Sequence, residues 1–403
     1  MRRDRGIVAA RPRRYLPPDM APPDLQTWLI AQITAKPTLD VLFNGFCKKL
    51  VKQGLPLWRV NIGLETLHPE DIGFSFLWID GELEERNRAR PGILTSSDYI
   101  NSPAKFVDDT GRPLRWRLGE DDRGMEIIAN LRAEGMTEYT MLPLPFLDSA
   151  ARSASLSFAT KAEGGFGDEG YEALQYAATL ISPLAERIAL RRVALDALTV
   201  YLGATAAQRA YNGQIERGDL RTMRAAILIA DLRGFTLLSD RLERRAMVAL
   251  LDRWFGVMGA AIEAEGGDIL KFMGDGLLAV FPLEDAAAES CAHALAAAKA
   301  TITGTAKLNE ELVAEGQAPL RFGLALHAGD VEFGNIGAAR RIDFTVIGPA
   351  VNHASRLQDL TKALQRPLVL SDAFVATLGQ RLPSLGFHAL RGVRQPVEVF
   401  APE

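Results

Sequence analysis

Two aspartates stand at the ends of strand-like segments, where a carboxylate is available to a metal ion. Asp231 follows the apolar run 224–230 and precedes a helical pattern that reaches Ala264, whereas Asp275 lies in the Gly274-Asp275-Gly276 turn of a predicted hairpin. Beside a helix start, a carboxylate can hold a metal ion while free amides donate to phosphate oxygens. Taken alone, an aspartate in the position of Asp231 is a capping residue about as often as a ligand, and one in the position of Asp275 is more often a purely structural turn residue. The pair therefore matters only if the fold gathers both around Mg²⁺ and a triphosphate.

An amide and a guanidinium follow near the carboxyl end of the chain. Asn352 and Arg356 are four residues apart, so a helix would place them on one face. By itself such a pair is typical of a solvated helix surface. It gains a role only from the motif around it.

The elements that must position these residues belong to two domains. The 403 residues are 48% hydrophobic and 24% charged, which is enough for two cores. Before residue 190 the pattern predicts a helix at 42–53, strands at 58–64, 74–78, 139–146 and 154–160, a helix at 125–134, and a long helix from Tyr171. This order indicates an α+β module with a closing helix.

Composition excludes several classes of protein. A net charge of −4 and the lack of a basic face argue against a nucleic-acid partner, and the apolar runs are too short to span a membrane. Cys47 and Cys291 lack metal-ligand spacing and are predicted to be buried thiols in a reducing compartment. We therefore expect a soluble, cytoplasmic protein. Residues 1–24, rich in Arg and Pro without a signal-peptide core, are predicted to be a flexible arm.

A heptad pattern joins the two domains. Apolar residues recur every seven positions from Leu174 to Leu202, which predicts a coiled-coil seam between two copies of the chain. Arg191 interrupts the seam and Pro183 introduces a kink. The alternative is an amphipathic helix packed on its own domain.

The N-terminal pattern resembles a GAF-type sensory domain, particularly in the strand Ser155–Thr160, the following Gly164-Gly-Phe and the final helix. The resemblance covers residues 25–190 and implies a small-molecule signal whose identity the sequence does not reveal. The segment 101–109 does not reproduce the family's cyclic-nucleotide signature. We therefore infer no cyclic-nucleotide ligand from this segment.

Three motifs in the second half resemble the catalytic domain of class III adenylyl and guanylyl cyclases. They are Ala-Asp-Leu-Arg-Gly-Phe-Thr at 230–236, Ile-Leu-Lys-Phe-Met-Gly-Asp-Gly at 269–276 and Val-Asn-His-Ala-Ser-Arg at 351–356. The resemblance covers residues 223–403, after a helical linker at 191–222. It implies a ferredoxin-like core, a homodimer, and conversion of ATP to 3′,5′-cyclic AMP by a phosphorus–oxygen lyase.

The resemblance also assigns roles to individual residues. Asp231 and Asp275 of one chain, with the carbonyl of Leu232, would bind two Mg²⁺ or Mn²⁺ ions. The partner chain would supply the base-binding pair Lys271 and Thr345, together with the catalytic Asn352 and Arg356. Three further residues complete the substrate-binding set: Phe235, Thr236 and Arg340.

The choice of base depends on Lys271 and Thr345. A lysine donor beside a hydroxyl acceptor complements adenine, whereas guanine would require an acid at position 271. The bicarbonate-responsive branch of the family pairs a lysine with a threonine in this way. The segment Gly-Gly-Asp-Ile-Leu-Lys-Phe at 266–272 also resembles that branch. This resemblance suggests bicarbonate as a further ligand. Two alternatives remain open, a guanylate cyclase and an inactive homologue that serves as a dimeric binding or scaffold module.

Overall fold

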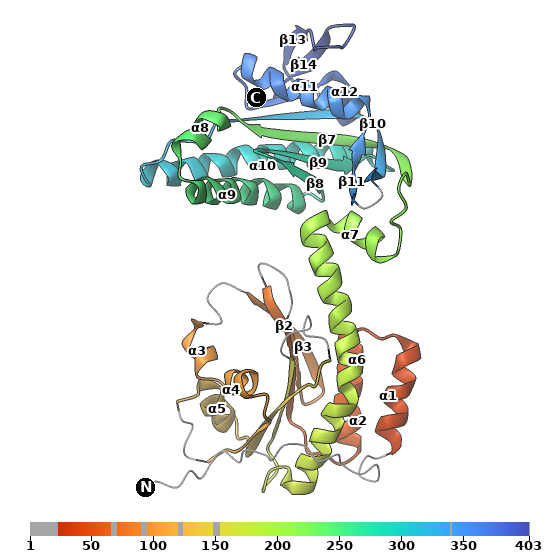
Figure 1. The fold of residues 1–403 in the computed structure, drawn as a ribbon, viewed down its shortest axis with the longest axis vertical. Coiled ribbons are helices and arrows are strands. Elements are labelled where there is room, and N and C mark those ends of the chain that lie inside the picture. Colours follow the sequence, from red (N-terminus) through yellow and green to blue (C-terminus); the bar gives the residue numbers. More distant parts are fainter. Residues whose placement is uncertain are drawn as a thin grey trace. The chain divides into compact units, whose positions relative to one another are not determined.

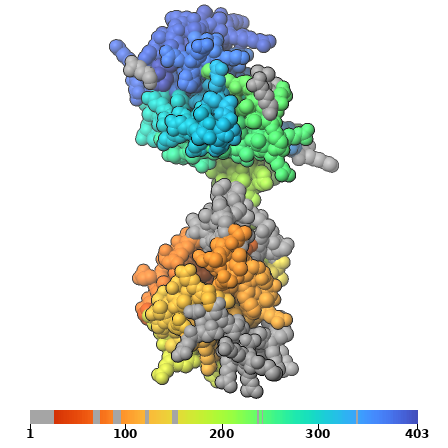
Figure 2. Space-filling view, turned by 90° about the vertical axis from the view of Figure 1, so that its left-hand side faces the viewer, coloured from red at the N-terminus to blue at the C-terminus, as the bar shows by residue number. Residues whose placement is uncertain are grey.

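The protein divides into two compact units, each built from one continuous stretch of chain. The computed structural model describes residues 23–65, 71–89, 95–119, 124–147, 154–338 and 341–402, so the predicted arm lies outside the described residues up to residue 22. The units are residues 1–200 and 201–403, and the colours of Figure 2 show that their sequences do not intermix. The boundary falls inside the predicted linker.

A single antiparallel sheet forms the centre of the first unit (Figure 1). Its order is β3-β2-β1-β6-β5-β4. The strands are β1 (Arg59–Glu65), β2 (Asp71–Ile79), β3 (Glu82–Ala89), β4 (Leu114–Arg117), β5 (Glu138–Pro143) and β6 (Ala154–Thr160). The helices are α1 (Pro23–Ala35), α2 (Leu39–Lys52), α3 (Ser97–Ile100), α4 (Pro103–Thr110), α5 (Glu126–Ala133) and α6 (Gly167–Leu202). This unit has the order of helix, sheet and closing helix that the sequence indicated.

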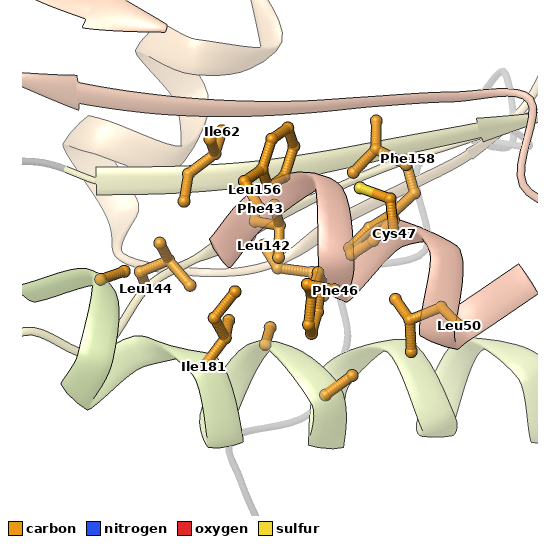
Figure 3. Packing of buried hydrophobic residues seen from close by; sticks show 14 of the residues in the cluster. Phe43, Phe46, Cys47, Leu50, Ile62, Leu142, Leu144, Leu156, Phe158 and Ile181 are labelled. Atoms are coloured by element: carbon orange, nitrogen blue, oxygen red, sulfur yellow. The ribbon is translucent and has the colours of Figure 1, made fainter. Parts of the chain in front are cut away.

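Helices α2 and α6 cover one face of this sheet. Phe43, Phe46 and Cys47 of α2 are fully buried against β1 and β6, and Figure 3 shows them between these strands and Ile181 of α6. Burial raises the pKa of the Cys47 thiol well above its usual range. Both cysteines are buried and free, as predicted.

The first half of the heptad pattern is part of this core. Leu174, Ala177, Ile181 and Leu184 of α6 are all buried within their own unit. Up to this point, therefore, the amphipathic-helix alternative accounts for the apolar spacing, and these side chains are not available to a second helix. Pro183 is exposed and α6 runs through it.

The second unit has a mixed eight-stranded sheet (Figure 1). Its path is β13-β14-β12-β10-β7-β9-β8, with β11 added to β10. The strands are β7 (Leu220–Leu232), β8 (Asp268–Met273), β9 (Gly276–Pro282), β10 (Phe322–Ala338), β11 (Arg341–Ile347), β12 (Leu368–Ser371), β13 (Ser384–His388) and β14 (Val397–Phe400). The helices are α7 (Ala204–Tyr211), α8 (Phe235–Arg241), α9 (Arg244–Ala264), α10 (Ala287–Ala314), α11 (Pro349–Ala363) and α12 (Asp372–Leu378).

From Ala225 to Ala230, strand β7 is buried on both faces, because helices cover both sides of this segment. Ala226, Leu228 and Ala230 face the cluster that contains α9 and α10. The alternate residues Ala225, Ile227 and Ile229 face the cluster that contains residues of α11. A strand that is covered by helices on both faces needs apolar side chains at every position, which explains the uninterrupted apolar sequence of this segment.

The helix predicted to run from the Asp231 motif to Ala264 is two helices. Leu242, between α8 and α9, has an extended backbone (φ −91°, ψ 148°) and its partly buried side chain packs on the core. Among the described residues, no helix is long and apolar enough to cross a membrane.

Candidate active site

The two predicted metal-binding acids lie together. Asp231 is the penultimate residue of β7 and pairs across the ladder with Gly276, directly after Asp275. Burial, the charge of Asp275 and a hydrogen bond to it raise the pKa of Asp231 to about 6. Two carboxyl groups so close cannot both ionise readily without a compensating cation. The pair is thus suited to bind positive charge.

Local sequence explains how this pair forms. Met273 pairs with Gly276, so Gly274 and Asp275 are the two loop residues of a hairpin. Gly274 has φ +67° at the first loop position, which a two-residue hairpin favours for glycine. Gly276 allows close packing, because a Cβ there would lie 2.9 Å from the carbonyl oxygen of Ala230 and 3.2 Å from Oδ1 of Asp231. The hairpin and its turn agree with the prediction.

The segment after Asp231 is tied to the neighbouring elements. The backbone amide of Leu232 donates to the Asp231 carboxylate and lowers its pKa. The Arg233 guanidinium donates through Nη2 to the carbonyls of Thr361 and Arg366, both at 2.7 Å. These bonds fix the end of β7 against the end of α11. Phe235, at the start of α8, packs on the core, whereas the side chain of Thr236 lies outside the described residues.

A second group of predicted residues gathers where β8 meets β11. Lys271 Nζ donates to Asp343 Oδ2 over 2.6 Å. Thr345 follows Asp343 by two residues on β11, is 6% exposed, and its Oγ1 has no hydrogen-bond partner. Asp343 was not predicted from the sequence. Its position two residues before Thr345 could have identified it, because residues two apart on a strand have their side chains on the same face.

A bulge in β8 lies directly before Lys271. The register shifts between Ile269, opposite Ala279, and Lys271, opposite Leu278. The extra residue, Leu270, is buried in the cluster beneath α11. A bulge bends a strand and re-aims the residues that follow it.

The predicted helix pair is confirmed as a pair on one helix. Asn352 and Arg356 lie one turn apart on α11, with Asn352 exposed and Arg356 half-buried. The Arg356 guanidinium passes close to Gly392, whose Cβ position would lie 3.4 Å from its Nη2. Asp359, a further turn along, was not predicted; its charge contributes to the raised pKa of Asp231. Its spacing of seven from Asn352 would have placed it on this face.

A stacked histidine pair lies behind Asn352. The rings of His327 and His353 are 4.5 Å apart and nearly parallel. Burial and the neighbouring His353 lower the pKa of His327 to about 4, and its Nδ1 is 2.9 Å from the Ser371 hydroxyl. Both rings are therefore neutral near pH 7 in this packing, since burial also lowers the pKa of His353.

One chain assembles these residues as two constellations. The acid pair lies at the β7 end and the β8–β9 turn, and the Lys271–Asp343–Thr345 group lies on β8 and β11. Lys271 is paired with Asp343, whereas Asp231 is hydrogen-bonded to Asp275. Among the described side chains, no cluster of three His, Cys, Asp or Glu could hold a metal ion. Arg340, the predicted phosphate-binding arginine, lies outside the described residues.

The comparisons with known proteins concern this second unit. Residues 220–388 match the family model of the adenylate and guanylate cyclase catalytic domain. The second unit contains a cyclase catalytic domain. The match covers the acid pair, the Lys271 group and the α11 residues, and it includes the three motifs on which the sequence resemblance rested.

Relatives of the cyclase domain include proteins named for either nucleotide. An adenylate cyclase of Anabaena cylindrica is 34% identical over 168 residues, which are 41% of this chain and 32% of that protein. The adenylyl cyclase CyaB from P. aeruginosa is 28% identical with a TM-score of 0.42, covering 45% of this chain and 94% of that one. The guanylyl cyclase Cya2 is 29% identical with a TM-score of 0.41, covering 45% and 92%. The chain spans about a third of the length of the curated relatives it matches.

Proposed function

We propose that the protein is an adenylate cyclase that converts ATP to 3′,5′-cyclic AMP and pyrophosphate. The half-buried pair of Asp231 and Asp275, inside the matched cyclase domain, carries this proposal. In the reaction the ribose 3′-oxygen forms a bond to the α-phosphorus, loses its proton, and the bond to the pyrophosphate oxygen breaks. The protein's task is to position these groups and compensate their charge.

The acid pair fits the two Mg²⁺ or Mn²⁺ ions that such a reaction uses. Carboxylate and carbonyl oxygens are the ligands that these hard cations prefer, and Asp231, Asp275 and the carbonyl of Leu232 supply them. The ions would lower the pKa of the 3′-hydroxyl and neutralise phosphate charge. The carboxylates hold the ions in place and do not attack the substrate.

The second constellation would act from the partner chain of a homodimer. In such a composite site, which the similarity to cyclase catalytic domains suggests, each chain would contribute one half to each of two equivalent centres. Arg356 would stabilise the negative charge that builds on the phosphoryl oxygens, and the Asn352 amide would orient the ribose. Their common face on α11 is consistent with joint action.

Lys271 and Thr345 support ATP over GTP. The ammonium donates to adenine N1, and the Thr345 hydroxyl, buried without a partner, accepts from the N6 amino group. Guanine presents an N1–H to the same lysine, and facing donors are costly when buried. A guanylate cyclase is the competing assignment.

The first unit is proposed to be a GAF-like sensory domain that controls the cyclase domain. The order of helix, antiparallel sheet and closing helix supports this assignment, and α6 leads directly from the sheet toward residue 202. A small-molecule signal would act by changing how two cyclase domains meet. Bicarbonate is proposed as a ligand of the cyclase domain, to be tested by adding it at fixed pH.

The test is cyclic-nucleotide production by the purified chain with ATP or GTP and Mg²⁺ or Mn²⁺. We expect cyclic AMP from ATP, and a loss of at least about 100-fold in Asp275→Asn, since this change removes a metal-binding charge while it keeps the size of the side chain. The matched control is Asp285→Asn, an exposed aspartate in the loop before α10.

Each outcome assigns a different function. Cyclic GMP as the main product would make the protein a guanylate cyclase. The absence of either product, with retained nucleotide binding, would favour the inactive binding module.

A further inference from the structure

We propose that Asp343 is a specificity-determining positioning residue, which holds the Lys271 ammonium where it can donate a hydrogen bond to adenine. The proposal rests on the proposed function. It concerns a residue outside the three motifs that the sequence singled out, and its carboxylate is 2.6 Å from the lysine nitrogen.

The surroundings of this ion pair argue against a purely structural role. The side chains of Lys271 and Asp343 are 29% and 58% exposed, and ion pairs this exposed contribute little to folding. Strand β11 is already joined to β10 along its whole length, from Arg341 to Ile347. The fold therefore gains little from the additional link between β8 and β11.

The geometry instead favours control of the lysine side chain. A lysine has a flexible four-carbon stem, and fixing it before a ligand arrives lowers the entropy cost of binding. The bulge at Leu270 shifts the register of β8 directly before Lys271, and Asp343 of β11 accepts one of the three ammonium protons of this lysine. Two N–H groups remain for a ligand.

Thr345 completes a surface that matches one edge of adenine. It lies on the same face of β11 as Asp343, and its buried Oγ1 lacks a hydrogen-bond partner. A donor held at Lys271 beside an acceptor at Thr345 faces the N1 and N6 positions of the base. Without Asp343 the ammonium would lose its anchor and its counter-charge at the same time.

Nucleotide binding tests the proposal independently of turnover. Full-length protein is titrated in a calorimeter with α,β-methylene ATP or α,β-methylene GTP and Mn²⁺, because the P–C bond of these analogues cannot be cleaved. We expect the parent to prefer the ATP analogue. Asp343→Asn, which removes the charge and keeps the shape, should reduce the ratio of the two affinities by about tenfold, and Asp343→Glu should restore part of it.

A double-mutant cycle separates positioning from a general effect of the substitution. If Asp343 acts through the lysine, Asp343→Asn should have no further effect on the ratio in a Lys271→Met background. Asp285→Asn should leave the ratio unchanged, and the thermal midpoints of all the variants should stay close to that of the parent.

The failures of the two proposals are distinguishable. An unchanged ratio in Asp343→Asn, or an equal loss with and without Lys271, overturns the role of Asp343 even if cyclic AMP is formed. The absence of cyclic AMP, with a ratio that depends on Asp343, overturns only the proposed catalysis. Failure of the parent to bind either analogue overturns both.

Discussion

At the scale of single residues, the site contains two kinds of charged group. Some have a partner of opposite charge, and others do not. Lys271 is paired with Asp343, whereas Asp231 faces Asp275 and the nearby charge of Asp359. The acid pair is therefore the place where a cation is most favourable. The neutral histidine pair behind Asn352 adds no charge of its own at pH 7.

The buried histidine should make the protein sensitive to mild acid. The pKa of His327 is about 4 in the folded chain and about 6.5 when unfolded, so the unfolded state binds more protons between these values. Stability is then fully present above pH 6.5 and is lost as the pH falls toward 4. At pH 5 the loss is about 2 kcal/mol.

Urea unfolding at pH 7 and pH 5, followed by circular dichroism, measures this loss. His327→Gln should unfold with a smaller difference between the two pH values than the parent. His293→Gln, at an exposed position on α10, is the matched control. An identical pH difference in His327→Gln and the parent would show that His327 does not carry the effect.

At the scale of elements, sequence patterns predicted what is local. The end of β7 at Asp231, the hairpin turn at Gly274 and the helical spacing of Asn352 and Arg356 each depend on a short stretch of chain, and all three are present. The contact of Lys271 with Asp343 joins positions 72 residues apart. It depends on the β8 bulge and on the register of β11, neither of which a local pattern encodes.

The same reasoning explains where the sequence was ambiguous or misleading. A seven-residue apolar repeat fits a coiled coil and also a helix on its own sheet, and the buried Leu174 and Ile181 follow the second pattern. The single helix predicted up to Ala264 is broken at Leu242, whose backbone is extended and whose side chain packs on the core, and such tertiary contacts can override a local helical pattern.

The close packing of β7 and β9 beside the acid pair leads to a test at this scale. Gly276→Ala would place a methyl group 2.9 Å from the Ala230 carbonyl oxygen, so the strands must separate and Asp231 must shift. Overpacking of this kind costs about 1–3 kcal/mol. We expect cyclase activity to fall by about tenfold or more.

Gly256→Ala on α9 is the matched control, because a Cβ at Gly256 meets nothing within 4 Å. Full activity in Gly276→Ala would show that the spacing of the strands does not position the acids.

At the scale of the whole molecule, two separate cores predict two unfolding events. The large clusters of the first unit and those of the second share no residue. Trp254 lies in the second unit, whereas the first contains Trp28, Trp58, Trp78 and Trp116. In Trp254→Phe, fluorescence should report the first unit alone, while circular dichroism reports both.

We therefore expect the fluorescence and dichroism curves of Trp254→Phe to differ in urea. Coincident curves at every denaturant concentration would indicate a single cooperative transition and contradict the independence of the two cores.

The central claim is a cyclase whose active centres each combine two chains, and complementation tests it most directly. Asp275→Asn should inactivate the metal-binding half, and Arg356→Ala the half on α11. Co-expressed, the two inactive chains form mixed dimers with one intact centre. We predict that they regain cyclic AMP synthesis to about a quarter of the parental activity. An active parent whose co-expressed variants remain inactive would contradict the composite site.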